Sequence, residues 1–312
     1  MKIALHSHST NSDGAYSPEQ IVDIAKSQGA KICAVTDHDY VTKPNNTDGI
    51  TYYSSAEFSA DDFSNFHILG YNLQNSTYIN AIYKYLNNLN DDKMHLIIQR
   101  LKDLNLDVDY DEVKSFAKGR VIDKTIIKQY LVVKKHVPDC KVAYSKYMGK
   151  GRPAYVKVRD LNATFIIKMI EACGGVAVLA HPTRIKMNNG ELINEQQLDE
   201  LVGKLVELGL TGLEVYNAKN DNNSTNMLME LCDKYGLIPL EGADFHEKED
   251  RLVLDSQFMD TYKFVNAVQQ AKDNYCINNV RAFHNKVAAP MLDIKNKVID
   301  EKSIESGEIL LQ

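Results

Sequence analysis

Short apolar segments alternate with amphipathic helical segments over much of this chain, and this alternation limits the fold more than any other feature. Apolar segments of strand length lie at residues 2–5, 31–36, 51–55, 66–71, 176–180, 212–216 and 237–240. Helical spacing of apolar residues follows several of them, as in the leucine-rich segment 198–208. Repeated strand–helix units predict a parallel sheet, either open or closed into a barrel. The sequence therefore predicts an α/β fold.

The alternation stops between residues 76 and 157, where the chain is polar and rich in Lys and Asn. The spacing of its leucines predicts helices and no strand–helix alternation. We therefore expect a discontinuous α/β domain formed by residues 1–75 and 158–285, interrupted by a mostly helical subdomain, residues 76–157. One further helix near residues 262–271 and a strand near residues 276–280 are expected before the end of the second part. The tail, residues 286–312, shows little pattern and no role is predicted for it.

Composition narrows the class of protein. The 312 residues are 44% hydrophobic and 25% charged, which is typical of a globular protein and excludes a disordered or coiled-coil chain. No apolar run approaches the roughly 20 residues of a membrane-spanning helix, and the first ten residues turn polar too early for a signal peptide. We expect a cytoplasmic protein with no membrane partner. The net charge of −6 argues against long duplex nucleic acid, although a local site could still attract a small anion.

The five cysteines lie far apart and form no CxxC pair. This pattern argues against a disulfide framework or a thiolate zinc site, and it predicts buried free thiols in a reducing compartment. Three of the nine histidines, His95, His136 and His284, lie in polar stretches without an acidic pattern around them. We expect these three side chains at the surface.

Residue types that bind metals gather at the ends of the predicted strands. The set consists of His6, His8, Asp13, His38, Glu57, His67, His181, Asp244 and His246. Residues i and i+2 of an extended segment point the same way, so His6 and His8 can aim at one place, as can Asp244 and His246. Imidazoles and carboxylates without thiolates favour Mn²⁺, Zn²⁺ or Fe²⁺. Nine ligands exceed the needs of one ion, and we expect two or three divalent ions.

Each of these motifs also has an ordinary structural interpretation. The segment Asp37-His38-Asp39 could form a capped turn, His67 could be a half-buried strand residue, and Asp244 could only cap a helix. Ligand residues at six separate strand ends are nevertheless hard to explain by packing alone, because the carboxyl ends of parallel strands are where α/β proteins collect functional residues. Closely spaced ions generate hydroxide at neutral pH and bind a phosphoryl group. The sequence therefore favours a metal centre for phosphate chemistry.

Six strings of this sequence resemble motifs of the PHP (polymerase and histidinol phosphatase) superfamily. They are HSHSTNSDG, VTDHD, AEFS, FHILGY, LAHP and GADFH, in the order in which the superfamily has them, within residues 1 to about 285. The insertion, including KYMGKGRPAYV at residues 146–156, resembles the branch that contains nucleoside 3′,5′-bisphosphate phosphatases and 5′→3′ exoribonucleases. The resemblance implies a distorted (β/α)₇ barrel with a trinuclear metal centre.

The resemblance also implies how the ligands are divided among the ions. Carried over by position, one ion is held by His6, His8, Glu57 and Asp244, a second by Asp13, His38 and His246, and a third by Glu57, His67 and His181.

Substrate contacts are implied less uniformly. Arg184 matches a phosphate-contacting arginine of the branch, which implies a catalytic and substrate-binding role. Two segments depart from the pattern. Residues 119–122 read Gly-Arg-Val-Ile where the branch has Arg-Pro-His, and residues 217–220 read Asn-Ala-Lys-Asn where many relatives carry a substrate-contacting histidine. Lys219 could supply the missing charge in substrate binding.

We therefore expect a metal-dependent phosphoesterase that hydrolyses a phosphate monoester, or a terminal phosphodiester, of a nucleotide or short oligonucleotide through a metal-activated hydroxide. A site histidine or Asp37 could give the leaving group its proton. The inserted subdomain is expected to cover the barrel mouth and to contribute to substrate choice. Two alternatives stay open, namely a histidinol-phosphate phosphatase and a non-catalytic, metal-dependent binding or regulatory module. The sequence does not define the oligomeric state.

Overall fold

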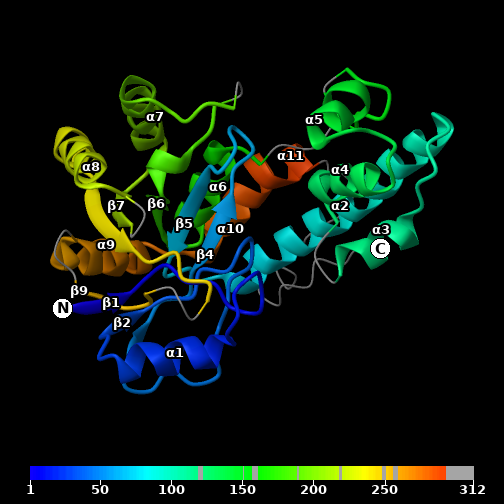
Figure 1. Ribbon diagram of the computed structural model, residues 1–312. Helices are drawn as coiled ribbons and strands as arrows, with labels where there is room; N and C mark the ends of the chain where they lie inside the picture. Colours follow the sequence, from blue (N-terminus) through cyan, green and yellow to red (C-terminus); the bar gives the residue numbers. More distant parts are fainter. Residues whose placement is uncertain are drawn as a thin grey trace. The chain divides into compact units, whose positions relative to one another are not determined.

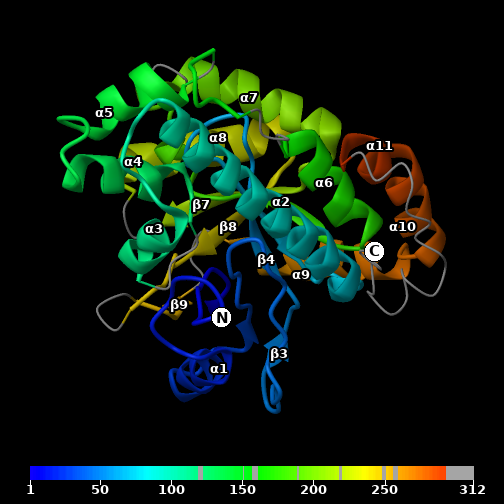
Figure 2. The same cartoon turned by 90° about the vertical axis from the view of Figure 1, so that its right-hand side faces the viewer.

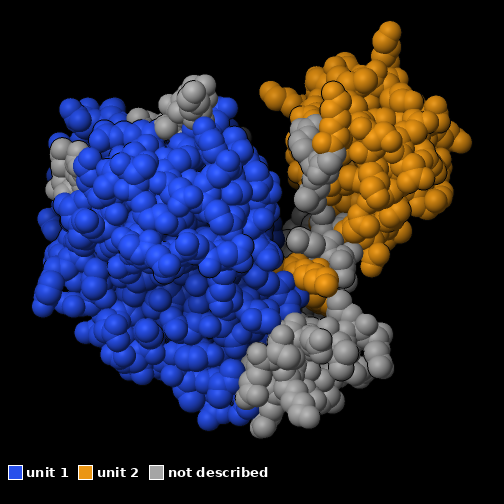
Figure 3. Space-filling view, turned by 90° about the horizontal axis from the view of Figure 1, so that it is seen from below, with its two compact units in different colours: residues 1–81, 160–312 blue, residues 82–159 orange. Residues whose placement is uncertain are grey.

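The computed structural model describes residues 1–118, 122–149, 151–156, 161–187, 190–217, 220–247, 251–255 and 259–292. The chain divides into two compact units, which Figure 3 colours separately. Residues 1–81 and 160–312 form the first, called here the sheet unit, and residues 82–159 form the inserted unit. None of the described helices combines the length and apolar character that crossing a membrane requires.

Two sheets lie within the sheet unit (Figure 1). The smaller has the order β3-β2-β1-β9, with strands Thr51–Tyr52, Ile32–Cys33, Lys2–Ala4 and Leu254–Asp255. The larger has the order β4-β5-β6-β7-β8, with strands Ala56–Ser59, His67–Tyr71, Val176–Leu179, Gly212–Asn217 and Ile238–Gly242. Pairing is parallel through β1-β2-β3 and β6-β7-β8, whereas β5 and β9 run antiparallel to their neighbours.

Two isolated bridges join the sheets just beyond their strands. Ser7 pairs with Phe245, which connects the end of β1 to the end of β8, and His38 pairs with Glu57, which connects the end of β2 to β4. These connections curve the two sheets toward one another at the carboxyl ends of the strands. The predicted α/β, barrel-like fold is confirmed, and the count of seven strand–helix units stays a prediction.

Helices cover the outer faces of the sheets (Figures 1 and 2). They are α1 Pro18–Ser27, α6 Ala163–Ala172, α7 Glu195–Leu208, α8 Asn222–Tyr235 and α9 Thr261–Asp273. Helix α1 begins at Pro18 because Ser17 and Gln20 form a capping box. Helix α7 ends at Gly209, whose φ of 110° suits a glycine.

The C-terminal part of the sheet unit differs from expectation. The predicted strand at residues 276–280 is wrong, because helix α10 spans Ile277–Phe283 and buries Val280 and Phe283 three residues apart on one face. A π-helical turn, His284–Ala288, and α11, Ala289–Leu292, continue it, so the described start of the tail is helical.

Two predictions of exposure need correction. His284 was expected at the surface, but it is only 3% exposed, and its Nδ1 lies 3.0 Å from the hydroxyl of Tyr78. Apolar neighbours on α10, such as Phe283, carry it into the core. Cys276 was expected to be buried and is exposed, whereas Cys33, Cys173 and Cys232 are buried free thiols as predicted.

All regular elements among the described residues of the inserted unit are helices, joined by turns and loops. Helix α2, Ser76–Asp103, begins in the sheet unit and continues into the inserted unit, where α3 Tyr110–Ala117, α4 Lys124–Val133, α5 Cys140–Ala143 and a π-helical turn, Tyr144–Met148, follow. Its own apolar core includes Met94, Ile98, Leu101, Ile127 and Leu131. The prediction of a mostly helical insertion is confirmed.

Candidate metal centre

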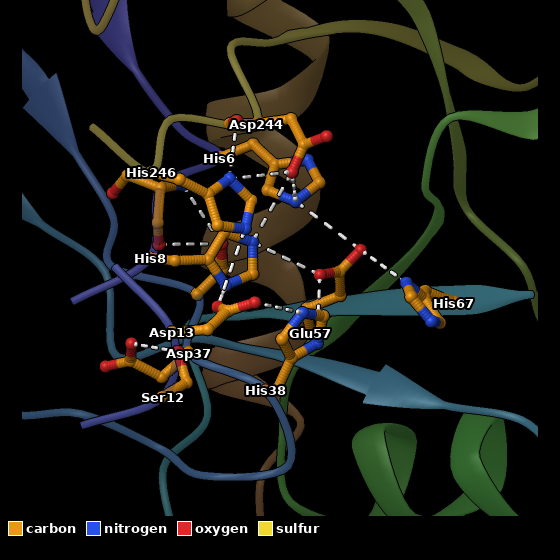
Figure 4. A network of polar contacts seen from close by, with 12 residues as sticks. His6, His8, Ser12, Asp13, Asp37, His38, Glu57, His67, Asp244 and His246 are labelled. Carbon is orange, nitrogen blue, oxygen red and sulfur yellow. Dashed lines mark hydrogen bonds and ion pairs between the residues drawn. The ribbon is translucent and has the colours of Figure 1, made fainter. Parts of the chain in front are cut away.

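The strand ends bring all nine predicted ligands together (Figure 4 labels eight of them). His6 and His8 follow β1, His38 follows β2, Glu57 lies in β4 and His67 opens β5. His181 follows β6, and Asp244 and His246 follow β8. Six of the nine residues therefore follow the carboxyl ends of the parallel strands β1, β2, β6 and β8, whereas Glu57 and His67 lie in the antiparallel pair β4-β5.

The bridge between Ser7 and Phe245 aligns the two segments that each carry two ligands. The backbone N–H of His8 donates to the carbonyl of Phe245 at 2.8 Å, and the N–H of Phe245 donates to the carbonyl of His6 at 3.2 Å. As a result, His6 Nε2 and His8 Nε2 lie 3.7 and 3.6 Å from Asp244 Oδ1. The rings of His8 and His246 stack with centroids 4.2 Å apart.

Glu57 occupies the centre of the cluster. Its carboxylate is 1% exposed, and imidazoles approach both of its oxygens. Oε1 lies 3.4 Å from His6 Nε2, 3.0 Å from His67 Nδ1 and 2.8 Å from His181 Nε2. Oε2 lies 3.2 Å from His8 Nε2 and 3.3 Å from His38 Nδ1. A carboxylate whose two oxygens face separate sets of imidazoles has the geometry of a bridging ligand.

Asp13 closes the more exposed side of the cluster. Its Oδ1 lies 3.6 Å from His8 Nδ1 and 3.5 Å from His246 Nε2, and its Oδ2 lies 3.8 Å from His38 Nε2. The carboxylate of Asp13 is about half exposed, unlike that of Glu57. The cluster therefore has a buried side around Glu57 and a side toward solvent around Asp13.

Four overlapping groups of ligand atoms, each within 4.8 Å of one another, could hold a metal ion. They are His8, Asp13, His38 and His246; His6, His8 and Asp244; His6, Glu57 and His181; and His38, Glu57 and His67. The groups contain the nine residues of the three implied sets. His8 also joins the group of Asp13, and Glu57 is shared by two groups.

Several buried imidazole nitrogens have no hydrogen-bond partner among the described residues. They are His6 Nε2, both ring nitrogens of His8, His38 Nδ1 and His181 Nδ1. Buried polar atoms without partners are rare because leaving them unpaired costs free energy. Cations between these nitrogens and the carboxylates would satisfy them. The donor set of imidazoles and carboxylates suits Mn²⁺, Zn²⁺ or Fe²⁺, so the residues present fit divalent metal ions.

Electrostatics within the cluster favour cations. Burial opposes ionisation of Glu57, but the imidazoles of His6 and His181 outweigh it and hold the pKa of this carboxyl well below its usual range. Contact with His246 is the main cause that lowers the pKa of Asp13 to about 2. Burial works against protonation of His8, yet contacts with Asp244 and Glu57 raise its pKa to about 9. The ionised carboxylates thus stay paired with the protonated imidazole of His8, whereas burial lowers the pKa of His38 to about 4. Divalent ions would compete with the proton on His8.

One further carboxylate, Glu214, lies next to the ligands and was not predicted from the sequence. Glu214 lies in β7, is buried, and accepts from His6 Nδ1 at 2.8 Å and from the backbone N–H of His181 at 2.6 Å. The second contact fixes a residue with a φ of 28°, a strained backbone that surrounding structure must hold. A charged residue inside an otherwise apolar parallel strand was the available signal.

A glycine makes room for this carboxylate. A Cβ on Gly242 of β8 would lie 1.5 Å from Glu214 Oε1 and 3.0 Å from His6 Cβ. Only a glycine therefore allows Glu214 to reach His6. A carboxylate that accepts the second N–H of a metal-binding histidine fixes its tautomer and ring orientation. Glu214 leaves His6 Nε2 directed toward Glu57 and Asp244.

Asp37, predicted as a catalytic candidate, is buried and accepts four hydrogen bonds. Oδ1 accepts from the backbone N–H of Ser9 at 2.6 Å and from the hydroxyl of Ser12 at 2.7 Å. Oδ2 accepts from the hydroxyl of Ser9 at 2.7 Å and from that of Thr42. These bonds hold the loop that carries Asp13. The catalytic role expected for Asp37 stays a prediction.

A cavity of about 580 Å³ opens beside the cluster within the sheet unit. It is lined by His38, Glu57, Asn65, His67, His181, Thr183, Arg184, Lys186, Leu192, Asp244 and His246. Arg184 is half-buried, and its Nη1 lies 2.6 Å from Asp244 Oδ2. The cavity thus combines the ligand cluster with two cationic side chains, as a site for an anion requires. Lys219 lies outside the described residues, as do residues 119–121 of the other departing segment.

The fold and the site define an α/β protein with a cluster of histidines and carboxylates at its strand ends. The PHP domain family matches residues 4–214, and the chain belongs to this family.

Curated relatives resemble this chain in sequence, and a solved structure resembles it in fold. The chain is 28% identical over 253 residues to a 5′-3′ exoribonuclease of Haemophilus influenzae, covering 78% of this chain and 90% of the relative. It is 24% identical over 259 residues to a 3′,5′-nucleoside bisphosphate phosphatase of Chromobacterium violaceum, covering 78% and 87%. A candidate metal-dependent phosphoesterase of Bifidobacterium adolescentis shares the fold with a TM-score of 0.58 and 20% identity, covering 88% of this chain and 96% of that one.

Proposed function

We propose that this protein is a metal-dependent phosphoesterase that hydrolyses a phosphate ester of a nucleotide or short oligonucleotide. The observation that carries the proposal is the buried carboxylate of Glu57 among five imidazoles, next to a cavity that contains Arg184. Membership of the PHP domain family supports phosphate-ester hydrolysis. Relatives named for nucleoside bisphosphates and RNA support the nucleotide part of the substrate.

The nine clustered residues would hold two or three divalent ions, of which Mn²⁺, Zn²⁺ or Fe²⁺ fit the donors. They are His6, His8, Asp13, His38, Glu57, His67, His181, Asp244 and His246. Bound ions of this kind supply Lewis acidity, which makes water a stronger nucleophile and neutralises charge on a phosphoryl group.

The protein's own groups bind and orient the phosphate. The guanidinium of Arg184 presents several N–H donors, and its contact with Asp244 holds it at the edge of the cluster, where a phosphate oxygen would also lie. We propose Lys219 as a second residue that contacts the substrate. Asp37 has both oxygens engaged by donors from its own loop region, so we assign it to positioning Asp13 and not to protonating the leaving group.

Purified protein supplied with Mn²⁺ tests the proposal against a panel of phosphate esters. The panel contains a nucleoside 3′,5′-bisphosphate, a 5′-phosphorylated oligoribonucleotide, a mononucleotide and histidinol phosphate. We expect turnover of the nucleotide esters and its loss in His38→Ala and Asp244→Ala. His95→Ala, an exposed histidine of the inserted unit, is the matched control and should keep full activity.

Three outcomes would contradict the proposal. Preferred turnover of histidinol phosphate would favour the corresponding phosphatase. Tight metal binding without turnover of any ester would favour a binding module. Unchanged activity in His38→Ala and Asp244→Ala would place the reaction elsewhere.

A further inference from the structure

Charge is distributed very unevenly along this chain. The whole protein has 36 Lys and Arg against 42 Asp and Glu. Residues 82–159 of the inserted unit, by contrast, contain 17 Lys and Arg against 9 Asp and Glu. The excess lies in the second half of that unit, where residues 113–159 contain 13 basic and 2 acidic residues. A basic segment in an otherwise acidic protein is typical of a surface that binds a polyanion.

The two acidic residues of this segment are both used as helix caps. The carboxylate of Asp123 accepts from the N–H of Ile126 at 2.7 Å at the start of α4, and that of Asp139 accepts from the N–H of Val142 at 2.8 Å at the start of α5. Negative charge in this position stabilises the helix dipole. These two carboxylates therefore stabilise the local fold, and the segment keeps its excess of basic over acidic residues.

Two half-buried lysines of α4 each lie near a tyrosine ring of the inserted unit. Lys124 and Lys128 lie one turn apart on α4 and thus share a side of the helix. The ammonium of Lys124 lies 5.5 Å from the ring centroid of Tyr155, and that of Lys128 lies 5.9 Å from that of Tyr144. Tyr144 is 50% exposed. We call these four residues the Lys–Tyr face.

The structure holds this face in place. Tyr144 opens the π-helical turn directly after α5, which packs beside α4 (Figures 1 and 2). The backbone carbonyl of Tyr155 accepts a hydrogen bond from Arg100 of α2, and the preceding Ala154 is buried. The backbone that carries the two tyrosines is thus held by helix packing and by the Arg100 contact.

We propose that the Lys–Tyr face binds single-stranded nucleic acid, with the lysines contacting phosphates and the tyrosines stacking on bases. This combination of cationic and aromatic side chains is how sequence-tolerant single-strand binding works. In duplex nucleic acid the bases are stacked inside the helix, so a tyrosine of the protein cannot stack on them. The RNA-binding role of this face is independent of the proposed function. Only its purpose rests on that function, namely to retain an oligonucleotide substrate on the protein.

The test measures RNA affinity of the full-length protein by fluorescence anisotropy, with a labelled 12-residue oligouridylate and a chelator that prevents hydrolysis. We expect Lys124→Gln/Lys128→Gln to weaken binding about tenfold and to reduce the slope of log affinity against log salt by about 1.4. Tyr144→Ala should weaken binding at least about fivefold, and Tyr144→Phe should restore it because the ring is retained.

The matched control is Lys263→Gln/Lys272→Gln on α9, which removes the same charge from two exposed lysines of the sheet unit. RNA affinity of this variant should stay within about twofold. Equal weakening in control and test variants, or unchanged binding in both Lys–Tyr variants, would overturn the proposal. A third result would also overturn the proposal. If Tyr144→Ala keeps its RNA affinity while the lysine variant binds inorganic polyphosphate more weakly, the surface binds polyanions in general and does not stack on bases.

Kinetics separate this inference from the proposed function. With Mn²⁺, the Lys–Tyr variants should raise KM for a 5′-phosphorylated oligoribonucleotide and leave kcat/KM for a nucleoside bisphosphate unchanged. If the unaltered protein turned over no substrate, only the proposed function would be contradicted, because RNA binding is measured without hydrolysis. Equal effects on both substrates would contradict only the role of the Lys–Tyr face.

Discussion

Replacing Glu214 by glutamine tests how far the metal centre depends on a residue outside the nine clustered side chains. The carboxylate accepts from His6 Nδ1 at 2.8 Å and from the N–H of His181 at 2.6 Å, in a fully buried position. Glutamine has the same shape but only one acceptor oxygen, and its NH₂ group would face one of the two donors. One buried donor therefore loses its acceptor, which costs about 1–3 kcal/mol of unfolding free energy.

Metal affinity should fall as well. Without a carboxylate on Nδ1, His6 is free to carry its proton on Nε2, the nitrogen directed toward Glu57. Loss of such an outer contact typically lowers metal affinity about 10–100-fold. Titration calorimetry of chelator-treated protein with Mn²⁺ measures the affinity, urea unfolding measures the stability, and ¹⁵N shifts of the His6 ring report its tautomer.

Glu241→Gln provides a control matched for burial. Glu241 is also buried, but it directly precedes Gly242 on β8 and so lies on the opposite face of the strand from the cluster. It should lose stability without losing metal affinity. If Glu214→Gln behaves in the same way, with the tautomer of His6 unchanged, then Glu214 only stabilises the fold and the argument for orientation fails.

Three further predictions follow from single contacts. Gly242→Ala should displace the Glu214 carboxylate, because the new Cβ would lie 1.5 Å from Oε1; we expect about 1–3 kcal/mol lower stability in urea and less metal in elemental analysis. The pKa of His8 is raised to about 9, so its contribution to stability is complete below about pH 6.5 and is lost as pH rises through 9. Metal-free protein should accordingly unfold at lower urea concentration at pH 9 than at pH 6.5, and an equal midpoint would refute this. Tyr78→Phe should cost about 1 kcal/mol by calorimetry, because His284 Nδ1 loses its buried partner.

The cluster could be predicted from sequence because its residues are chemically distinctive and follow apolar strands. His6 and His8 stand directly after a strand, where an i, i+2 pair of ligands has few other uses. Glu214 could not be found in the same way, since it lies within an apolar strand and its partners come from β1 and β6, far away in the chain. Its importance depends on the register of β7 against β8, which one sequence does not reveal.

Local periodicity was weakest where segments are short. Residues 276–280 have too few positions to distinguish a strand from a helical turn, and burial of Val280 and Phe283 decided for the helix. Strand β4, only four residues long, was not separated from the segment before it, although Glu57 was recognised within it. His284 was predicted at the surface because it lies in a polar stretch of the sequence. Its buried contact is with Tyr78, which lies 206 residues earlier in the chain.

The bridge between Ser7 and Phe245 has a consequence for biogenesis. It places the earliest ligand, His6, against the latest ones, Asp244 and His246, so the metal centre needs both ends of the sheet unit. Closing so long a loop is entropically costly and slow compared with local helix formation. During synthesis the ribosome must release nearly the entire sheet unit before the groups that contain Asp244 or His246 can form, whereas the two groups around Glu57 contain no residue after His181. Full loading of the metal centre should therefore be a late event in synthesis.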